Sequence, residues 1–357
     1  MKKIVFVHLF NDRSGSPKVL SQVIKSVSRS GKAVEILTSY HSDGFLSDLP
    51  GTRRLVFYRR YESKLLTLIC YFLSQVSLFL NCLRYWRQDV FFYINTIMPF
   101  GAALAARVMG KQVLYHVHET SIRPALLKRF LRLVMSLTAS KVIFVSTYLL
   151  QTDGFENKRQ YIVHNAFDPE FSRSLVKQQG EFFTVLMVCS LKKYKGVLEF
   201  FDLAHLFVSQ PSVRFTLILN ADQPEIDAYF SGRAISSNVK IFPRQSNVSK
   251  FYTDASLLLN LSRPDECVET FGLTILEGMA YGLPVIVPPI GGPAEIVTDG
   301  QEGFLISCYE TGKISAVIEK LSSDPDLHWR LACNAQARAK DFNLANFEEK
   351  IAEIIEL

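Results

Sequence analysis

Short apolar runs alternate along this chain with longer stretches that have the apolar spacing of helices. The runs are rich in β-branched and aromatic residues, and the stretches 18–30 and 124–137 repeat apolar residues at three- and four-residue steps. Strands that alternate with helices favour a parallel sheet covered on both faces. The first series of predicted strands is Ile4–Leu9, Ala33–Thr38, Leu55–Tyr58, Val90–Ile94, Gln112–Val117 and Lys141–Val145.

The same alternation begins again in the second half of the chain. The polar segment 167–180 between the two series lacks strand character and is predicted as a linker. A chain of 357 residues, 48% of them hydrophobic, can supply two domains with a core each. We therefore expect an α/β protein with two facing, Rossmann-like, doubly wound parallel-sheet domains, residues 1–166 and 181–340, whose ligands bind beyond the carboxyl ends of the strands. The second series of strands is Phe182–Ser190, Phe215–Asn220, Val239–Phe242, Leu257–Leu261 and Pro284–Val287.

The charge of the chain is divided unevenly between its halves. Residues 1–170 hold 23 Lys and Arg against 11 Asp and Glu, a net charge of +12, whereas residues 171–357 hold 17 against 23, a net charge of −6. A basic half indicates an anionic partner, a phosphorylated lipid surface or a nucleic acid, unless its charges form only a solvated face. Because no recognisable nucleic-acid module accompanies them, we expect an anionic membrane surface and no nucleic acid.

The cysteines and the N-terminus favour a cytoplasmic protein. The six cysteines lie far apart without a Cys-x-x-Cys pair, as expected of reduced core thiols. The apolar run that follows Met1 is too short for a signal peptide and is predicted as a buried strand.

The segment 65–83 carries no charge over a length that could span a bilayer. Polar residues nonetheless recur in it and at its flanks at three-, four- and seven-residue steps, which places them in one stripe of a helix. We therefore expect an amphipathic helix that covers a sheet, with part of its apolar face available to lipid. The stripe consists of Lys64, Thr67, Ser74, Ser77, Asn81, Arg84 and Gln88.

The most informative motif lies in the segment 263–295. It follows a buried strand, and a helical pattern begins at Gly272 and is closed by Gly282. Glu269 therefore lies just before a helix and Glu277 on its second turn, so that both can face one ligand. Surface charges and simple turns would explain an isolated pair of glutamates with this spacing.

The chemistry of the motif suits a nucleotide ligand. The N–H groups of Phe271, Gly272 and Leu273 would form an anion site at the helix N-terminus, where the helix dipole adds to their attraction. A single carboxylate such as Glu277 can accept hydrogen bonds from two neighbouring ribose hydroxyls.

The motif resembles the donor-site signature of glycosyltransferase family 4, a large GT-B family of retaining, nucleotide-sugar-dependent enzymes. The resemblance is dense over about forty residues, and it implies that Glu269 contacts the donor sugar, that the amides after it hold sugar and phosphate, and that Glu277 binds ribose. It also implies that the last helix, 341–357, returns to the first domain. The match continues through Gly282-Leu283-Pro284-Val285-Ile286, Gly291-Gly292-Pro293-Ala294-Glu295-Ile296-Val297 and Asp299-Gly300-x-x-Gly303-Phe304-Leu305.

A second family element departs from the expected pattern. The family has an arginine and a lysine that neutralise the leaving diphosphate; here Lys195 matches, but Ser190 stands in place of the arginine. Cations at this point should bind the transition state better than the ground state. We expect Lys192, Lys193 or Arg263 to supply the missing charge, the alternative being that the lysines belong to a solvated loop.

In the first domain, the resemblance points to His118 and Gly15. The family places a histidine beside the donor sugar at the strand end where His118 lies, and a neutral imidazole could hydrogen-bond a sugar hydroxyl. His116 is expected to be a core group. The family's glycine pair after the first strand is reduced to Gly15, and the segment Asn165-Ala166-Phe167-Asp168 is interpreted as interdomain structure.

No metal ion or other cofactor is expected. The sole Asp-x-Asp, Asp324-Pro325-Asp326, opens a helical stretch and is better explained by helix capping. No P-loop or Gly-x-Gly-x-x-Gly fingerprint occurs, which counts against P-loop enzymes and dehydrogenases.

The resemblance thus implies a metal-independent, retaining hexosyltransferase that uses a nucleoside diphosphate sugar. We expect a glycan or lipid-linked glycan acceptor, a role in bacterial surface polysaccharide synthesis such as O-antigen, lipopolysaccharide, capsule or exopolysaccharide, and a peripheral position at the inner face of the cytoplasmic membrane. The alternatives are a catalytically silent GT-B subunit, which would bind donor without turnover, and an epimerase or phosphorylase on the same fold.

Overall fold

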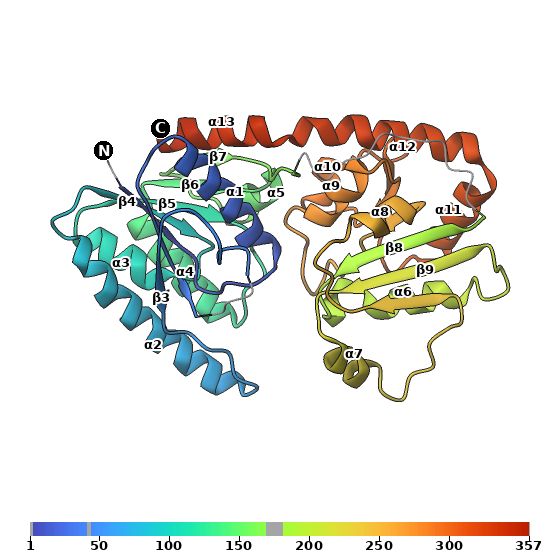
Figure 1. Cartoon of the computed structure of the whole chain (residues 1–357), viewed down its shortest axis with the longest axis horizontal. Coiled ribbons are helices and arrows are strands. Elements are labelled where there is room, and N and C mark those ends of the chain that lie inside the picture. Colours follow the sequence, from blue (N-terminus) through green and yellow to red (C-terminus); the bar gives the residue numbers. More distant parts are fainter. Residues whose placement is uncertain (1–2, 41–43, 169–180, 357) are drawn as a thin grey trace. The chain divides into compact units, whose positions relative to one another are not determined.

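The computed structural model of the chain describes residues 3–40, 44–168 and 181–356. The chain divides into two compact units, Met1–Asn165 with Ala345–Leu357, and Ala166–Leu344. Each unit is built on one parallel sheet with helices around it (Figure 1). The predicted fold class of two Rossmann-like α/β domains is thereby confirmed, whereas most of the predicted linker 167–180 lies outside the described residues.

The sheet of the first unit has the order β3-β2-β1-β4-β5-β6-β7, and all its neighbouring strands are parallel. Its two edges differ from the prediction. The edge strand β3 begins three residues earlier than predicted because its exposed residues lack the apolar signal of a buried strand, and the half-exposed β7 was missed for the same reason. The strands are β1 Lys3–Val7, β2 Val34–Ser39, β3 Thr52–Val56, β4 Val90–Asn95, β5 Gln112–Val117, β6 Lys141–Phe144 and β7 Arg159–Ile162.

Three helices of this unit, α2, α3 and α4, lie side by side in one layer (Figure 1). The close approach of α2 and α3 depends on Gly101, because a Cβ atom there would lie 2.1 Å from the carbonyl oxygen of Gln75. The C-terminal helix α13 packs on the same unit, and Lys141 Nζ donates to the carbonyl oxygen of Ile354 at 2.7 Å. The helices are α1 Gly15–Arg29, α2 Lys64–Cys82 with the 3-10 turn Leu83–Tyr85, α3 Phe100–Val108, α4 Ala125–Thr138, α5 Thr147–Asp153 and α13 Leu344–Ile355.

The sheet of the second unit has the order β10-β9-β8-β11-β12-β13 and is also parallel. Strand β13 was not predicted; its Gly303 allows close pairing, since a Cβ there would lie 1.9 Å from the carbonyl oxygen of Val285. The strands are β8 Phe183–Cys189, β9 Val213–Leu219, β10 Val239–Phe242, β11 Leu257–Leu259, β12 Val285–Val287 and β13 Gly303–Leu305.

The helices of the second unit cover this sheet around a core rich in phenylalanine. Asp324 caps α12, accepting a hydrogen bond from the Leu327 N–H at 2.9 Å, which confirms the predicted capping role of the Asp-x-Asp segment. The helices are α6 Val197–His205, α7 Gln223–Phe230, α8 Ser249–Asp254, α9 Leu273–Ala280, α10 Pro293–Ile296, α11 Thr311–Ser323 and α12 Pro325–Ala339, with 3-10 turns at Lys193–Lys195 and Lys340–Phe342.

Candidate functional site

In the second unit, the loop between β11 and α9 is held by the glycine pair that follows β12. Gly291 has φ +84°, and a Cβ atom there would lie 2.3 Å from the carbonyl oxygen of Glu269. The N–H of Gly292 donates to that same carbonyl oxygen at 3.0 Å. Both glycines therefore have the same function, because any side chain would displace the segment that carries Glu269.

Lys195 and Glu269 form an ion pair in which Lys195 Nζ lies 2.6 Å from Glu269 Oε2. Lys195 is brought there by a tight turn at Gly196, whose φ is +78° and where a Cβ would lie 2.0 Å from the carbonyl oxygen of Leu261. Burial by itself would raise the pKa of Glu269, but the charge and hydrogen bond of Lys195, together with the hydrogen bonds from Asn260 and Phe271, outweigh it and the pKa is lowered. The pair is therefore ionised at neutral pH.

The predicted amide site at the start of α9 is partly occupied by the protein itself. The backbone N–H of Phe271 and the side chain of Asn260 hydrogen-bond the Glu269 carboxylate. Gly272 has φ +103° and directs the chain into the helix at Leu273. The N–H groups of Gly272 and Leu273 have no hydrogen-bond partner among the described residues. The candidate anion site thus comprises two amides rather than three.

Glu277 lies on the second turn of α9, as predicted, and is buried. Its Oε2 atom accepts a hydrogen bond from the hydroxyl of Tyr252 at 2.8 Å. Tyr252 comes from α8 and its ring stacks on that of Tyr281 at a centroid distance of 5.4 Å. Tyr252 was not predicted as a site residue, because a lone tyrosine in a short helix has no pattern that distinguishes it from a core residue.

The three candidates for the missing cation differ in their surroundings. Arg263 is buried and bonds both Glu199, at 2.5 Å, and Glu266, at 2.7 Å, so that two carboxylates compensate its charge. Lys192 and Lys193 follow Ser190 at the end of β8 and are exposed, with no ion pair in the described parts of the chain. Of the three predicted cations, only these two lysines therefore have charge available for a ligand.

In the first unit, polar side chains gather at the carboxyl ends of β1, β4 and β5, which are neighbours in the sheet. His118 Nε2 lies 2.9 Å from Asn95 Oδ1. The amide nitrogen of Asn95 donates to the carbonyl oxygen of Ser16 at 3.1 Å and lies 3.1 Å from His8 Nδ1. Because the amide is oriented in this way, Nε2 of His118 carries the proton and donates to Asn95.

Burial keeps the histidines of this cluster neutral. It lowers the pKa of His8 to about 4 and that of His118 well below its usual value, with His116 and His8 adding to the latter shift. His116 lies within β5, where Nδ1 is 2.7 Å from the hydroxyl of Tyr93, as expected for a core group. A neutral His118 can therefore act as a hydrogen-bond partner at neutral pH.

Two further residues at these strand ends were missed. Thr96, directly after Asn95, has φ +69°, a conformation that is costly for a β-branched residue and is often associated with functional sites. Glu119 Oε1 accepts a hydrogen bond from the N–H of Ile97 at 3.2 Å, and burial raises the pKa of Glu119 to about 7. Such a carboxyl group can carry a proton near neutral pH.

Gly15 begins α1, which follows β1 after the loop of residues 8–14, so it lies on the same side of the sheet as His118, at the carboxyl ends of the strands. The loop before it is ordered by Asp12, whose Oδ1 accepts a hydrogen bond from the N–H of Ser14 at 3.0 Å. The next residue, Ser16, is the one that orients Asn95. Each unit thus places its candidate residues at the carboxyl ends of its own strands, where ligands of doubly wound sheets bind.

Among the residues that the structure describes, no group of three or more His, Cys, Asp or Glu side chains is arranged to hold a metal ion.

The chain is similar to known proteins in sequence and in fold. Residues 168–338, a little under half of the chain, match the family model described as glycosyl transferases group 1. The sucrose synthase of Denitrovibrio acetiphilus is 42% identical over 80 residues, 20% of this chain and 10% of that protein. The N-acetyl-alpha-D-glucosaminyl L-malate synthase of Bacillus anthracis is 27% identical over 183 residues, 48% of this chain and 46% of that protein. The chain thus aligns with less than half the length of either relative.

Among solved structures, the HepE protein of Anabaena, in complex with UDP and glucose, superposes with a TM-score of 0.82 at 20% identity, over 100% of both chains. This likeness shows the fold. Together with the family match it supports the GT-B glycosyltransferase superfamily for this chain.

Proposed function

We propose that the chain transfers a sugar from a nucleoside diphosphate sugar to a glycan or lipid-linked glycan, with retention at the anomeric carbon and without a metal ion. The observation that carries the proposal is the Lys195–Glu269 pair beside the amides of Gly272 and Leu273. It joins a cation, a carboxylate and a helix N-terminus, the groups that a sugar and its leaving diphosphate require.

Each group of the second unit has a role in this reaction. Lys195 and the two amides stabilise the negative charge that develops on the diphosphate, and Lys192 and Lys193 add to it in place of the family's arginine at Ser190. Glu269 accepts hydrogen bonds from the sugar. Glu277 binds ribose, and the hydrogen bond from the Tyr252 hydroxyl to one of its carboxylate oxygens fixes the orientation of the carboxylate. Arg263 is left with a structural role.

In the first unit, neutral His118, which is oriented through Nε2 by Asn95, hydrogen-bonds a sugar hydroxyl. Gly15 allows the backbone to approach the phosphates or the acceptor. No covalent nucleophile is required if the leaving phosphate itself takes the proton of the acceptor hydroxyl as the new bond forms on the same face of the sugar.

The UDP complex of the Anabaena protein makes uridine the first base to test, and glucose the first sugar. Membrane placement at the cytoplasmic face, and a role in surface polysaccharide synthesis, follow from the basic first half of the chain and remain part of the proposal.

Calorimetry with UDP-, GDP-, dTDP- and ADP-sugars tests the donor site. One donor class should bind the wild type, and Glu277→Gln should weaken that binding at least about tenfold, since a charged hydrogen-bond acceptor is lost. Asp202→Asn, on α6 and outside the site, is the matched control and should bind normally. If no donor binds, or if the variant binds as tightly as the wild type, the assignment is wrong.

Product analysis tests the rest of the proposal. With a donor identified, nuclear magnetic resonance of the product should show the anomeric configuration of the donor, and a chelator should leave the rate unchanged. Donor binding without turnover on any acceptor would instead support a silent subunit, a reading that the serine at position 190 favours.

A further inference from the structure

Helix α2 lies with its apolar face outward. Ser74 and Gln75 are completely buried against the unit, and Gln75 Oε1 accepts a hydrogen bond from the N–H of Gly101 at 3.0 Å. A helix that covers a sheet normally shows the opposite pattern. The large apolar side chains that α2 leaves exposed are Leu65, Leu66, Ile69, Phe72, Leu73, Val76 and Leu80.

The same orientation recurs on α4, two helices away. Leu126, Phe130, Leu133 and Leu137 are exposed and follow one another at three- and four-residue steps. The two stripes are joined by rings: Phe100 of α3 lies between Phe72, at a centroid distance of 6.1 Å, and Phe130, at 5.1 Å. We call the exposed apolar side chains of α2 and α4, with these three rings, the α2–α4 face. A contiguous exposed apolar surface of this kind marks an interaction site.

The charged residues within the three helices of this face are all basic. The sequences of α2, α3 and α4 contain Lys64, Arg107, Lys128, Arg129 and Arg132 and no Asp or Glu. Lys128 and Arg132 pair with Asp153 from α5, whereas Arg129 is exposed. An apolar face with a cationic border is complementary to an anionic bilayer, because apolar side chains enter the interface while cations meet the head groups.

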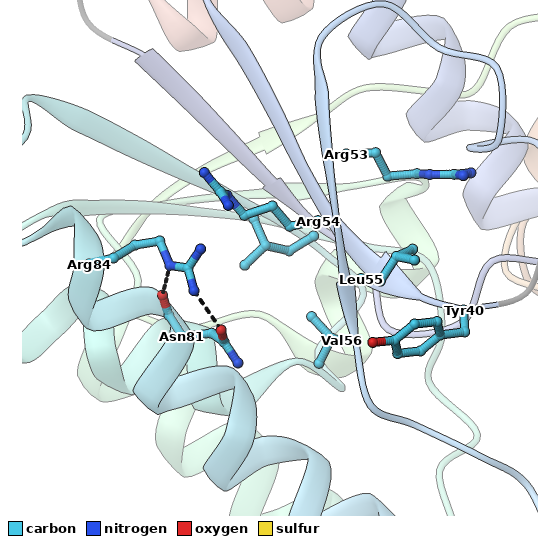
Figure 2. A pocket seen from close by; sticks show the side chains of 8 residues that line it. Tyr40, Arg53, Arg54, Leu55, Val56, Asn81 and Arg84 are labelled. Atoms are coloured by element: carbon cyan, nitrogen blue, oxygen red, sulfur yellow. Dashed lines mark hydrogen bonds between the residues drawn. The ribbon is translucent and has the colours of Figure 1, made fainter.

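At its C-terminal end, α2 borders a basic pocket of about 340 Å³. Figure 2 shows Asn81 of α2 and Arg84 of the 3-10 turn that follows it, opposite Arg54 and Val56 of the edge strand β3. Arg54 is paired with Glu35, but Arg84 bonds only neutral oxygens of Asn81 in the described structure. Arg84 follows Leu80 by four residues and therefore lies at the border of the apolar stripe. Its charge is available for a phosphate.

We infer that the α2–α4 face docks flat on an anionic lipid bilayer and that the pocket at Arg84 receives lipid phosphate at its border. The inference rests on the proposed membrane placement but not on the proposed reaction. By length and composition the helix Lys64–Tyr85 could also cross a membrane, but 33% of its apolar 18-residue segment is buried in the protein, and its inward side carries the buried Gln75, which bonds α3. Helix α2 therefore lies on the surface of the bilayer, because its inward side is already packed against the protein.

A second copy of the chain fits this face less well. A twofold dimer would bring the same patch of each copy together. Lys128 and Arg132 are paired with Asp153, but the three helices themselves carry no carboxylate that could oppose Lys64, Arg107 and Arg129 of a second copy, so like charges would meet around the contact.

Flotation of the full chain with vesicles tests the inference. Vesicles of phosphatidylcholine with 30% phosphatidylglycerol should bind the wild type about tenfold or more better than pure phosphatidylcholine vesicles, and binding should weaken with salt. The triple variant L73S/V76S/L80S should lose at least about tenfold, because each change removes apolar area that enters the interface. Arg84→Gln should lose about fivefold, as expected for one cation at an anionic surface.

Matched controls separate the face from general effects. The pair L206S/V208S removes exposed apolar side chains from the second unit, and Arg233→Gln removes an exposed cation there; both should bind vesicles as the wild type does. The altered side chains are exposed, so thermal melting should be nearly unchanged. Alkaline carbonate should release the bound protein.

Several outcomes would overturn the inference. These are wild-type binding that is absent or equal for both vesicle types, unchanged binding of the triple variant, carbonate-resistant insertion, or a wild-type dimer in solution that L73S/V76S/L80S dissociates. Donor calorimetry on the same samples reports the proposed sugar transfer separately, so that either proposal can fail while the other stands.

Discussion

Asn95 presents its side-chain oxygen to His118 at 2.9 Å while its amide nitrogen is held by the backbone of Ser16 at 3.1 Å. One side chain thus links the start of α1, at Gly15 and Ser16, to the candidate sugar-binding histidine. It also determines which nitrogen of the imidazole carries the proton. Asn95 is therefore a positioning residue in the proposed reaction.

Asn95→Ala should lower kcat by up to about a hundredfold, because His118 loses its orientation while remaining present. Donor binding, measured by calorimetry, should change by less than about threefold. Asn95→Asp should keep the geometry but add a negative charge beside the ring, which raises the pKa of His118 and moves the pH profile of kcat upward. Asn334→Ala, on the exposed surface of α12, serves as the control. A normal kcat in Asn95→Ala would show that the hydrogen bond is not used.

Lys195→Met should lower kcat about 10²- to 10³-fold, as the loss of a group that stabilises developing charge does. Glu269→Gln should also lose activity, and the double variant should be little worse than either single one, since the two groups act as a pair. Steady-state kinetics of the three variants form the test. Fully multiplicative effects would indicate independent roles.

The Lys195–Glu269 pair also makes stability depend on pH. The pKa of Glu269 is lowered in the folded chain, so its contribution to stability is present above the ordinary carboxyl pKa and is lost as pH falls through the lowered value. Wild-type melting temperature should therefore fall more steeply below about pH 4.5 than that of Glu269→Gln. Parallel curves for the two proteins would contradict the ionised pair.

The accuracy of the strand predictions depended on how deeply each strand is buried. The strand Gln112–Val117 was predicted with its observed bounds because buried parallel strands have continuous apolar runs. The half-exposed edge strands Arg159–Ile162 and Gly303–Leu305 have short or polar runs and were missed. Periodicity likewise predicted that the polar residues of α2 form a stripe. It could not predict which side of the helix faces the protein, because the spacing of residues groups them on one side without showing whether that side is buried.

Only the part of the candidate site that lies in one continuous stretch of sequence could be predicted. Glu269 and Glu277 lie in one continuous motif, so their spacing indicated a shared helix terminus. Asn95, Thr96 and Glu119 come from separate strand ends that only the order of the sheet brings together. Nothing in a lone asparagine or glutamate signals such a neighbourhood. The pairing of Arg263 with Glu199 could not be predicted either, since the two residues are 64 positions apart in the chain.

Glu119 leads to a further pH prediction. Burial raises its pKa to about 7, so the folded state holds a proton that the unfolded state has released at neutral pH. Stability from this group is complete below the ordinary carboxyl pKa of about 4.5 and is lost as pH rises through about 7. Glu119→Gln keeps the neutral form at all pH values. The variant should therefore melt at a relatively higher temperature than the wild type at pH 8, and the difference should shrink toward pH 5.

Arg263→Met separates a structural arginine from a ligand-binding one. The change leaves Glu199 and Glu266 without their partner, and a broken buried pair costs on the order of 3 kcal/mol. The melting temperature should fall by about 5–10 °C. Adding Glu199→Gln to Arg263→Met should restore part of the loss, because one uncompensated charge is removed.

Donor affinity of Arg263→Met at 20 °C should stay within about threefold of the wild type, whereas Lys192→Gln with Lys193→Gln should weaken donor binding without lowering the melting temperature. If Arg263→Met instead lost donor affinity while the two lysine changes left affinity unaltered, Arg263, and not the two lysines, would supply charge to the diphosphate.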